Sequence, residues 1–418
     1  MLEALKNAWR IPDLRKRIQF TVLMLVVFRV GAFVPVPGMD PAAVKAMIEK
    51  GALLGFFDII SGGAFKQFSV FAMSITPYIN ASIIVQLLTI VIPRWEELAK
   101  EGEAGRKVLA QYTRYGTVIL ALIQAIGLSI GFSGAMKHHS ILDSIIVVIS
   151  LTAGTAFLMW LGEQITDKGI GNGISLLIFA GIVSRLPSGA YQLYQLIRVG
   201  TTNIFMVIVF AVFALAVIVG VIAVQQAERR VPVQYAKRVV GRRVYGGQST
   251  HIPIKVNAAG VIPVIFALSI LLFPSTVAGF FPNSKIAVGI ANFIKPGGWL
   301  YASLYAILII FFTYFYTAVT FNPVEVAENM KKYGGFIPGL RPGRPTAEYL
   351  DRIMTRITLV GAIFLAAIAI LPYLTTSVTS LNIYFGGTAL LIVVGVALET
   401  MKLIEAQMLM RHYQGFLK

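Results

Sequence analysis

The chain has 418 residues, of which 57% are hydrophobic and only 13% are charged, whereas soluble domains carry about 25% charged residues. A single water-soluble core of this length could not enclose so many apolar side chains, so the composition excludes a soluble enzyme. The net charge of +17 must therefore be interpreted by its position along the chain, and the absence of cysteine excludes disulfides and thiolate metal sites.

Long stretches without Lys, Arg, Asp or Glu predict the membrane-spanning helices, because about 20 helical residues cross a bilayer core of about 30 Å. The first five spans are expected at 18–36, which Arg29 interrupts, and at 67–93, 115–136, 144–162 and 170–186. The last five are expected at 199–227, 256–284 and 296–324, with two more inside 357–398. The pattern predicts an all-α polytopic membrane protein with ten transmembrane helices.

The segment 51–66, ahead of the second span, is too short and too rich in glycine to cross the membrane alone. Irregular backbone at membrane depth survives only inside protein or beside a watery cavity. We therefore expect a re-entrant segment that acts as a plug within a funnel. An amphipathic loop outside the membrane is the alternative that this composition leaves open.

The basic residues fall mostly in alternate loops, counted from the N-terminus, as the positive-inside rule requires of cytoplasmic loops. Both chain termini are therefore expected in the cytoplasm. Two loops on this side, 225–255 and 322–352, are longer than a fixed topology needs. The first alternates Val, Tyr and Arg ahead of Gly246 and Gly247, which predicts a hairpin. The second is rich in Gly and Pro over 334–345, which predicts an ordered, turn-rich loop.

Two short motifs recur in the same order in both halves of the chain. Pro77 to Ala81 shares Pro, Ile and Ala with Pro263 to Ala267, and Gly173 to Ile178 shares Gly, two Leu and Ile with Gly387 to Ile392. An internal repeat with five spans per half, an odd number, would place the two halves in inverted orientations around a central site.

The proposed halves are residues 1–200 and 201–418, and the bulky residues that the motifs share are Ile79, Ile265, Ile178 and Ile392. Side chains of this kind offer no charge and no ligand, but they can form a hydrophobic constriction that blocks ions by dewetting. The alternative is that these isoleucines simply face lipid or a neighbouring helix.

At these positions the chain resembles the SecY family, the channel subunits of the bacterial protein-conducting translocon, nearly from end to end. The segments that carry the resemblance are Arg29 to Pro37, Phe57 to Phe65, Ile75 to Thr89, Gly169 to Ser175, Tyr235 to His251, Lys255 to Asn257, Gly260 to Pro263 and Arg341 to Gly343. The resemblance implies two halves, hinged near spans five and six, that surround a central pore and open sideways between spans two and seven. Such a channel passes unfolded secretory polypeptides across the membrane and releases transmembrane segments into lipid.

The resemblance also implies roles for individual residues. The pore ring would consist of Ile75, Ile79, Ile174, Ile178, Ile265 and Ile392. The plug would include Phe57, Asp58, Ile59, Ile60, Ser61, Gly62, Gly63 and Phe65. The lateral gate would carry the polar residues Gln86, Thr89, Gln124 and Asn257. The docking surface for a motor or a ribosome would contain Arg238, Arg242, Arg243, Arg341 and Arg344.

The partners that the resemblance implies are the small membrane subunits SecE and SecG, the SecA motor ATPase, the ribosome, signal peptides, nascent chains and the lipid bilayer. Ribosomal RNA would be attracted by the basic cytoplasmic loops through its phosphates, in a salt-dependent manner. The implied location is the bacterial plasma (inner) membrane, and the resemblance implies no cofactor and no metal.

A passive channel is the first hypothesis, because the sequence has no glycine-rich nucleotide motif. An ion-coupled secondary transporter is the alternative, since that class is also built from inverted repeats. Coupling normally needs ionisable residues inside the membrane, yet the candidates fall at span ends: Asp143, Glu163, Asp167 and Glu399.

Arg29 is a charged residue inside the first expected span. Its side chain either reaches the lipid headgroups, as arginines near span ends do, or ties the first span to the plug. A membrane enzyme is not expected, because all four histidines lie in loops or near the chain end, namely His138, His139, His251 and His412.

Overall fold

The computed structural model describes residues 9–50, 61–138, 140–200, 204–235, 238–240, 243–245, 249–279, 289, 298–379 and 387–415. The helices of the first half are α2 (Pro12–Gly31), α3 (Pro41–Lys50), α5 (Thr76–Val91), α6 (Pro93–Lys100), α7 (Glu103–Gly131), α8 (Ile141–Lys168), α9 (Gly173–Val183) and α10 (Leu186–Arg198). Those of the second half are α11 (Ile204–Gln226), α12 (Ile262–Gly279), α14 (Trp299–Thr320), α15 (Pro323–Lys332), α16 (Arg344–Thr379) and α17 (Gly387–Gly415). The strands are β1 (Glu228–Tyr235), β2 (Arg238–Val240), β3 (Arg243–Tyr245), β4 (Ser249–Lys255) and β5 (Gly335–Phe336).

Each expected span contains a helix of the structure, in the order α2, α5, α7, α8, α9, α11, α12, α14, α16 and α17. By length and composition, 7 helices of the described residues can cross a membrane, or 8 if the bent pair α5 and α6 counts as one span. The apolar part of α12 is shorter, at Ile262–Pro274. The predicted helical membrane fold is therefore confirmed at this level.

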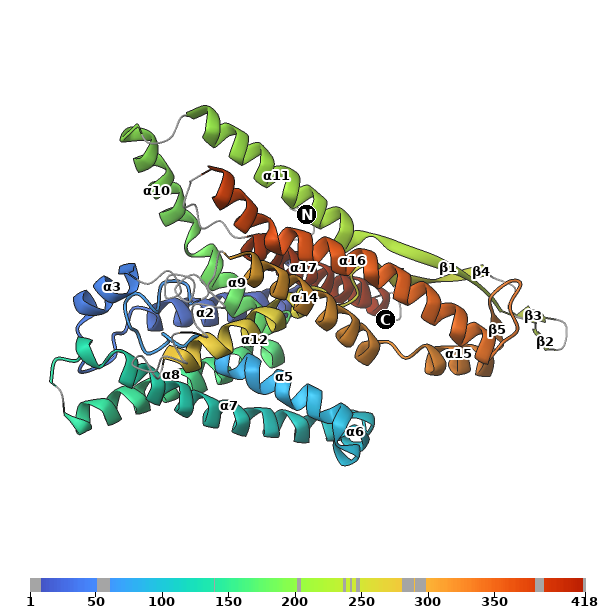
Figure 1. Ribbon diagram of the computed structural model, residues 1–418. Helices are drawn as coiled ribbons and strands as arrows, with labels where there is room; N and C mark the ends of the chain where they lie inside the picture. The colour runs from blue at the N-terminus through green and yellow to red at the C-terminus, as the bar shows by residue number, and fades with distance from the viewer. Residues whose placement is uncertain are drawn as a thin grey trace.

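The helices form two groups that meet at the centre of the molecule (Figure 1). In the view of Figure 1, α5, α7 and α8 lie below, α11, α14, α16 and α17 lie above, and α9 and α12 lie between the groups. α12 packs on α14, α5 and α7, while α9 packs on α8 and α17. Elements from both ends of the chain therefore share one apolar core.

The second span begins later than its apolar composition suggests. Residues 67–75 were expected to be helical, but 61–75 is a run of turns and α5 begins only at Thr76. Phe68 and Ser74 have positive φ values of 44° and 54°, which a right-handed helix does not allow. The backbone N–H groups of Val36 and Val70 donate to the carbonyls of Phe68 and Val34, each at 3.0 Å. Pairing with the strand-like 34–36 segment thus replaces the expected helix.

The two long loops form one small sheet at the end of the molecule opposite α3, in the strand order β4-β1-β5 (Figure 1). β1 pairs antiparallel with β4, and β5 adds Phe336 opposite Gln234. The predicted hairpin is confirmed, but the innermost pair of β2 and β3 joins Val240 to Arg243. The turn position expected at Gly246 and Gly247 was therefore wrong, and those glycines lie outside the described residues.

Four short helices were not predicted, and each has a proline in its first two positions: α3, α6, α10 and α15. Proline suits these positions because its fixed φ is helical and its missing N–H would have no partner there. α15 shows the complete start signal, since the Asn322 side chain accepts from the N–H groups of Val324 and Glu325. Proline after a capping residue was thus a readable signal for this helix.

Candidate functional site

The six isoleucines expected to form a ring all lie in or against the large central hydrophobic cluster, although they come from distant parts of the chain. Ile75 and Ile79 lie at the start of α5, Ile265 lies on α12, Ile392 lies on α17, and Ile174 and Ile178 lie on α9. Five of them are between 2% and 8% exposed and belong to one buried hydrophobic cluster. Ile174 is partly buried and packs against the same cluster.

Two glycines set the position of Ile174: Gly173, which begins one of the repeated motifs, and Gly162, which sequence reasoning did not single out. A Cβ on Gly162 would lie 2.5 Å from Cδ1 of Ile174, and one on Gly173 would lie 1.9 Å from the Gly162 carbonyl oxygen. The backbones of α8 and α9 therefore touch at this level. Ile174 therefore lies against α8 at Gly162, while α9 also packs on α17.

Chemically, the six side chains can only exclude water. All are branched hydrocarbons, so they hold no ion and transfer no proton. A narrow passage bounded by such side chains dewets, which blocks ions, while rotamer changes let it accommodate passing apolar or polar side chains.

The described part of the expected plug is a tight turn against the core. Phe57, Asp58, Ile59 and Ile60 lie outside the described residues. Ser61 and Phe65 are buried, and the Ser61 hydroxyl accepts from the Phe65 N–H at 3.0 Å. Gly62 and Gly63 have φ values of 64° and 94°, which favour glycine. Phe65 and Phe68 then pack on Phe132, with ring centroids 5.8 and 5.4 Å away.

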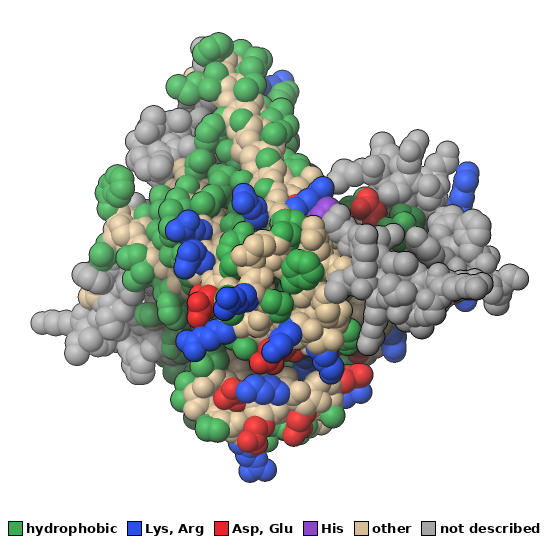
Figure 2. Space-filling view, turned by 90° about the vertical axis from the view of Figure 1, so that its right-hand side faces the viewer, with side chains coloured by type: hydrophobic (Ala, Val, Ile, Leu, Met, Phe, Trp, Pro, Cys, Tyr) green, Lys and Arg blue, Asp and Glu red, His purple; other side chains and the backbone are tan. Residues whose placement is uncertain are grey.

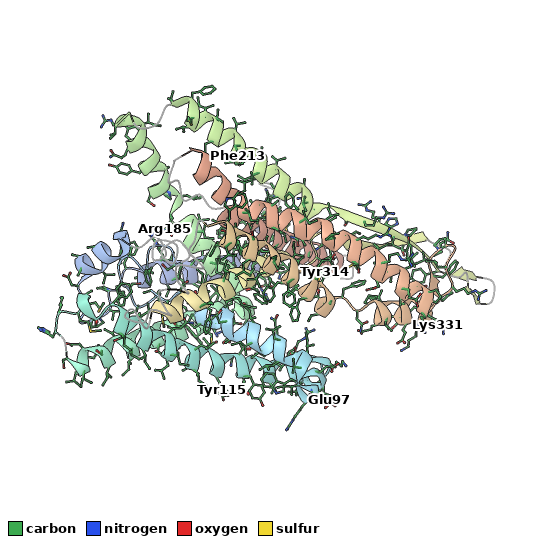
Figure 3. The ribbon with its side chains drawn as sticks, in the orientation of Figure 1. Glu97, Tyr115, Arg185, Phe213, Tyr314 and Lys331 are labelled. Atoms are coloured by element: carbon green, nitrogen blue, oxygen red, sulfur yellow. The ribbon has the colours of Figure 1, made fainter. Side chains whose placement is uncertain are left out.

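Two arginines lie beside this turn. The guanidinium Nη1 of Arg29 donates to the Gly62 carbonyl oxygen at 2.7 Å, so of the two alternatives for this residue the structure has the tie to the 61–75 segment. Arg185 was not predicted as a site residue, and it lies where α9 meets α10 (Figure 3). A Cβ on Gly63 would lie 3.5 Å from Nη2 of Arg185.

Three of the polar residues expected at a lateral gate lie on α5 and α7, which contact α12, and the fourth precedes α12. Their described hydrogen bonds are local. The Thr89 hydroxyl donates to the Gln86 carbonyl at 2.6 Å, and the Gln86 amide donates to Ser82 at 3.4 Å, all within α5. Gln124 on α7 is 7% exposed. Asn257, ahead of α12, is 5% exposed and donates to the Gly260 carbonyl at 3.0 Å.

The Oδ1 atom of Asn257 is buried and has no hydrogen-bond partner. An unsatisfied buried acceptor costs about 1–3 kcal/mol. The segment ahead of α12 therefore contains a polar atom that would gain free energy if a donor reached it.

Lys and Arg side chains, with some Asp and Glu among them, gather on the end of the molecule shown in Figure 2, where the described parts of the two long loops lie. Arg341 is exposed, and Arg344 is 90% exposed and pairs with Glu348 at 3.1 Å. The backbones of Arg238 and Arg243 lie in β2 and β3, and Arg242 lies outside the described residues.

A small hydrophobic core beneath this surface joins the two loops: Val231, Val233, Ile254, Met330, Ile337, Leu350 and Met354. The loops are thus one folded unit, which the sequence did not predict, because a two-residue strand such as β5 leaves no periodic signal.

A charged pair joins two long helices: Arg114 on α7 and Glu163 on α8, with Nε and Oε1 2.7 Å apart. Glu163 was expected at a span end, with no partner named. Its side chain is 22% exposed, so the two charges compensate each other in a partly solvated position.

The SecY family model matches residues 69–401 of the chain. The protein translocase subunit SecY of Halalkalibacterium halodurans is 52% identical over 435 aligned residues that cover 100% of both chains. A solved SecY structure matches with a TM-score of 0.69 and 20% identity over 94% of this chain and 92% of that one. Its plug domain is described as stabilising the closed state of the translocation channel and maintaining a membrane seal. Sec61 from the canine ribosome-channel complex of the endoplasmic reticulum matches with a TM-score of 0.64 and 19% identity over the same shares. At these identities the two structures are similar in fold.

Proposed function

The chain belongs to the SecY family of protein translocase subunits, and from this premise we propose that it is the channel through which unfolded secretory polypeptides cross the membrane. It is a protein translocation channel, and it works passively, with the driving force supplied by an external motor or by a ribosome. The observation that carries this function is the central apolar cluster, which contains isoleucines from α5, α9, α12 and α17. Bulky aliphatic side chains of this kind suit a seal against ions that a polypeptide can push apart.

The proposed architecture has ten membrane crossings in two inverted halves, 1–200 and 201–418. The occurrence of a helix in every expected span supports this count. The packing of α9 and α12 between the two groups of helices supports a pore between the halves. The proposed ring consists of Ile75, Ile79, Ile174, Ile178, Ile265 and Ile392.

The proposed lateral gate lies between α5 and α12, through which transmembrane segments and signal peptides would pass into lipid. The contact of α12 with α5 and α7 supports this position. A signal peptide would supply the donor that the Asn257 Oδ1 atom lacks. The proposed plug is the segment near 57–65, whose turn at Ser61 to Phe65 packs beside the core.

The proposed docking surface is the folded unit formed by the loops 225–255 and 322–352. Its exposed arginines, above all Arg341, suit the phosphates of ribosomal RNA or an acidic surface of the motor SecA. The small subunits SecE and SecG are the further proposed partners. The proposed location is the bacterial inner membrane, with both termini in the cytoplasm, which is the side where the basic loops lie.

No catalytic role is proposed for this channel subunit. The comparisons give no support to an ion-coupled transporter. The described charged pair between α7 and α8 is a compensated ion pair, which does not point to ion coupling.

Cysteine crosslinking of a stalled secretory chain tests the proposed function, because the protein has no native cysteine. Single cysteines at the six ring positions are expected to crosslink to a cysteine within the stalled chain. Cysteines at Ile119 and Ile208, which are 59% and 56% exposed on the outsides of α7 and α11, serve as matched controls. Crosslinks at the controls instead of the ring would refute the proposed path.

A further inference from the structure

We propose that Phe71 is a positioning residue that fixes Ile75 in the proposed ring, by holding the 67–75 segment between α2 and α8. The inference rests on the proposed function, because the position of Ile75 matters to the channel only if the six isoleucines form its seal. Phe71 lies outside the proposed ring, plug, gate and docking surface. Three features give it this role: ring stacking, two helical glycines and one tight turn.

Phe71 belongs to a stack of three aromatic rings. Its ring is stacked on that of Phe28 on α2, with centroids 6.2 Å apart and planes at 13°. It is also stacked on the ring of Phe157 on α8, with centroids 5.9 Å apart and planes at 8°. Such stacks add to the free energy gained by burial alone. The buried ring of Phe71 therefore has a nearly parallel neighbour from each helix.

Two glycines let both helices approach this segment closely. A Cβ on Gly31 of α2 would lie 2.1 Å from Cε2 and 2.5 Å from Cζ of Phe71. On α8, a Cβ on Gly154 would lie 1.9 Å from the Val70 carbonyl oxygen and 3.4 Å from Cδ1 of Phe71. Small residues allow close approach of this kind between membrane helices. Phe71 therefore occupies a slot that a methyl group on Gly31 would partly fill.

The backbone beside Phe71 is held in place as well. The Val70 N–H donates to the Val34 carbonyl at 3.0 Å. The Phe71 N–H donates to the hydroxyl of Ser69, a fully buried residue, at 3.2 Å. Loss of a hydrogen-bond partner in a buried position costs free energy. Movement of Phe71 along α2 is therefore opposed by these bonds as well as by the stacked rings.

One tight turn connects Phe71 to the proposed ring. The Phe71 carbonyl accepts from the Ser74 N–H at 2.8 Å, and Ser74 has a φ of 54°, so the chain turns sharply here. Ile75 follows directly as the capping residue of α5. Its carbonyl in turn accepts from the Ile79 N–H at 3.1 Å. A displacement of Phe71 would therefore be carried to Ile75, and from there to the first turn of α5.

Thiol labelling of the Ile75→Cys variant tests this role, because the protein has no native cysteine. The full chain is reconstituted in proteoliposomes and exposed to a water-soluble methanethiosulfonate reagent. Ile75 is 2% exposed, so the thiol is expected to react slowly while Phe71 is present. Phe71→Ala, added to this variant, is expected to raise the labelling rate about tenfold, which corresponds to about 1.4 kcal/mol in the free energy of exposing position 75. An unchanged rate would overturn the inference.

Leu365→Ala is the matched control for a general loss of packing. Leu365 is fully buried in the same central cluster, but it lies on α16, which packs on α14 and α17. This variant is expected to lower the temperature of thermal unfolding about as much as Phe71→Ala does, while labelling of position 75 stays slow. Equal labelling rates in the two variants would overturn the inference, because the increase would then reflect loosening of the whole core.

Gly31→Ala tests the slot while Phe71 itself is retained. The added methyl group would displace the ring and is expected to raise the labelling rate of position 75. Gly220→Ala on α11, whose Cβ would meet no atom within 4 Å, is expected to leave the rate unchanged. Phe71→Leu removes Cε2 and Cζ, the ring atoms nearest the methyl group. The double variant Gly31→Ala/Phe71→Leu is therefore expected to be labelled more slowly than Gly31→Ala alone, and faster labelling would refute the inference.

Resting ion conductance in planar bilayers, measured for Phe71→Ala and Gly31→Ala with Ile75 retained, distinguishes failure of this inference from failure of the proposed function. Faster labelling together with raised conductance would support both. Faster labelling with wild-type conductance would support the role of Phe71 and refute the seal that the proposed function assigns to the ring. Unchanged labelling would refute the role of Phe71 alone, whatever the conductance.

Discussion

Truncation of one ring isoleucine should separate the sealing role of that side chain from its contribution to stability. Ile79→Ala removes three carbon atoms from a side chain that is 6% exposed. At about 0.8 kcal/mol for each buried methylene, the transfer term is about 2 kcal/mol, and the cavity brings the cost to about 2–5 kcal/mol. Alanine preserves the helix, so α5 itself should remain intact.

The matched control is Ile83→Ala, one turn further along α5. Ile83 is 2% exposed and belongs to the same cluster, but it lies outside the proposed ring. Its truncation should cost at least as much stability as that of Ile79, because it is the more buried side chain. We expect Ile79→Ala to raise the resting ion conductance in planar bilayers and Ile83→Ala to leave it unchanged.

Thermal unfolding in detergent measures the stability of both variants, and single-channel recording measures the leak. If conductance follows the loss of stability in the two variants, the leak reflects general loosening of the core and the ring hypothesis is wrong. Equal conductance of Ile79→Ala and the wild type would also contradict it.

Three further predictions concern packing, charge and docking. Gly154→Ala should lower the free energy of unfolding by about 1–3 kcal/mol, because its Cβ would lie 1.9 Å from the Val70 carbonyl oxygen. Gly220→Ala on α11 places its Cβ where no atom lies within 4 Å, so it should raise the free energy of unfolding by up to about 1 kcal/mol. Thermal unfolding that ranks the two variants in the opposite order would contradict this packing argument. Arg114→Gln should destabilise the protein by about 1 kcal/mol. In a double-mutant cycle, the further substitution Glu163→Gln should restore part of this loss of stability. If the stability losses of the two single variants simply add, the two side chains do not interact. Arg341→Ala should weaken ribosome binding and lower the slope of log affinity against log salt concentration by about the value of one phosphate contact. Arg344→Ala should have a smaller effect on ribosome binding, because Arg344 already pairs with Glu348. Equal effects of the two variants in a sedimentation assay would argue against this ranking.

The membrane helices could be predicted from sequence because a bilayer imposes both length and hydrophobicity. Their ends could not be predicted in the same way. α7 begins at Glu103 and α16 at Arg344, well ahead of the charge-free stretches at 115 and 357. Helix continues wherever backbone hydrogen bonds and local packing allow it, and charged residues in water do not interrupt it.

In the segment 67–75 the sequence predicted helix where the structure has none. Its composition is as apolar as that of a span, yet it pairs with the 34–36 segment through two backbone hydrogen bonds. Phe68 and Ser74 take positive φ values there, which no sequence pattern signals for such residues. Tertiary contacts therefore override a hydropathy pattern that holds elsewhere in the chain.

Part of the candidate site could be predicted from the sequence. The repeated motifs identified Ile79, Ile178, Ile265 and Ile392, because a pseudo-symmetric centre uses equivalent positions of both halves. Arg185 and Gly162 could not be identified, because their importance depends on which backbone lies opposite them. Such contacts are properties of packing between α8, α9 and the turn at Gly62, and each residue taken alone looks ordinary.

The continuity of α16 has a mechanical consequence. The helix starts inside the proposed docking surface, where Leu350 and Met354 are part of the small core. Residues 344–356 extend the helix by about 20 Å before the apolar stretch begins. The same helix then packs along α14 and α17, and the Tyr314 hydroxyl donates to the Thr355 carbonyl at 3.0 Å. Because an α-helix bends little over a length of about 20 Å, a partner that pushes on the start of α16 would tilt the whole helix and the helices packed on it, α14 and α17.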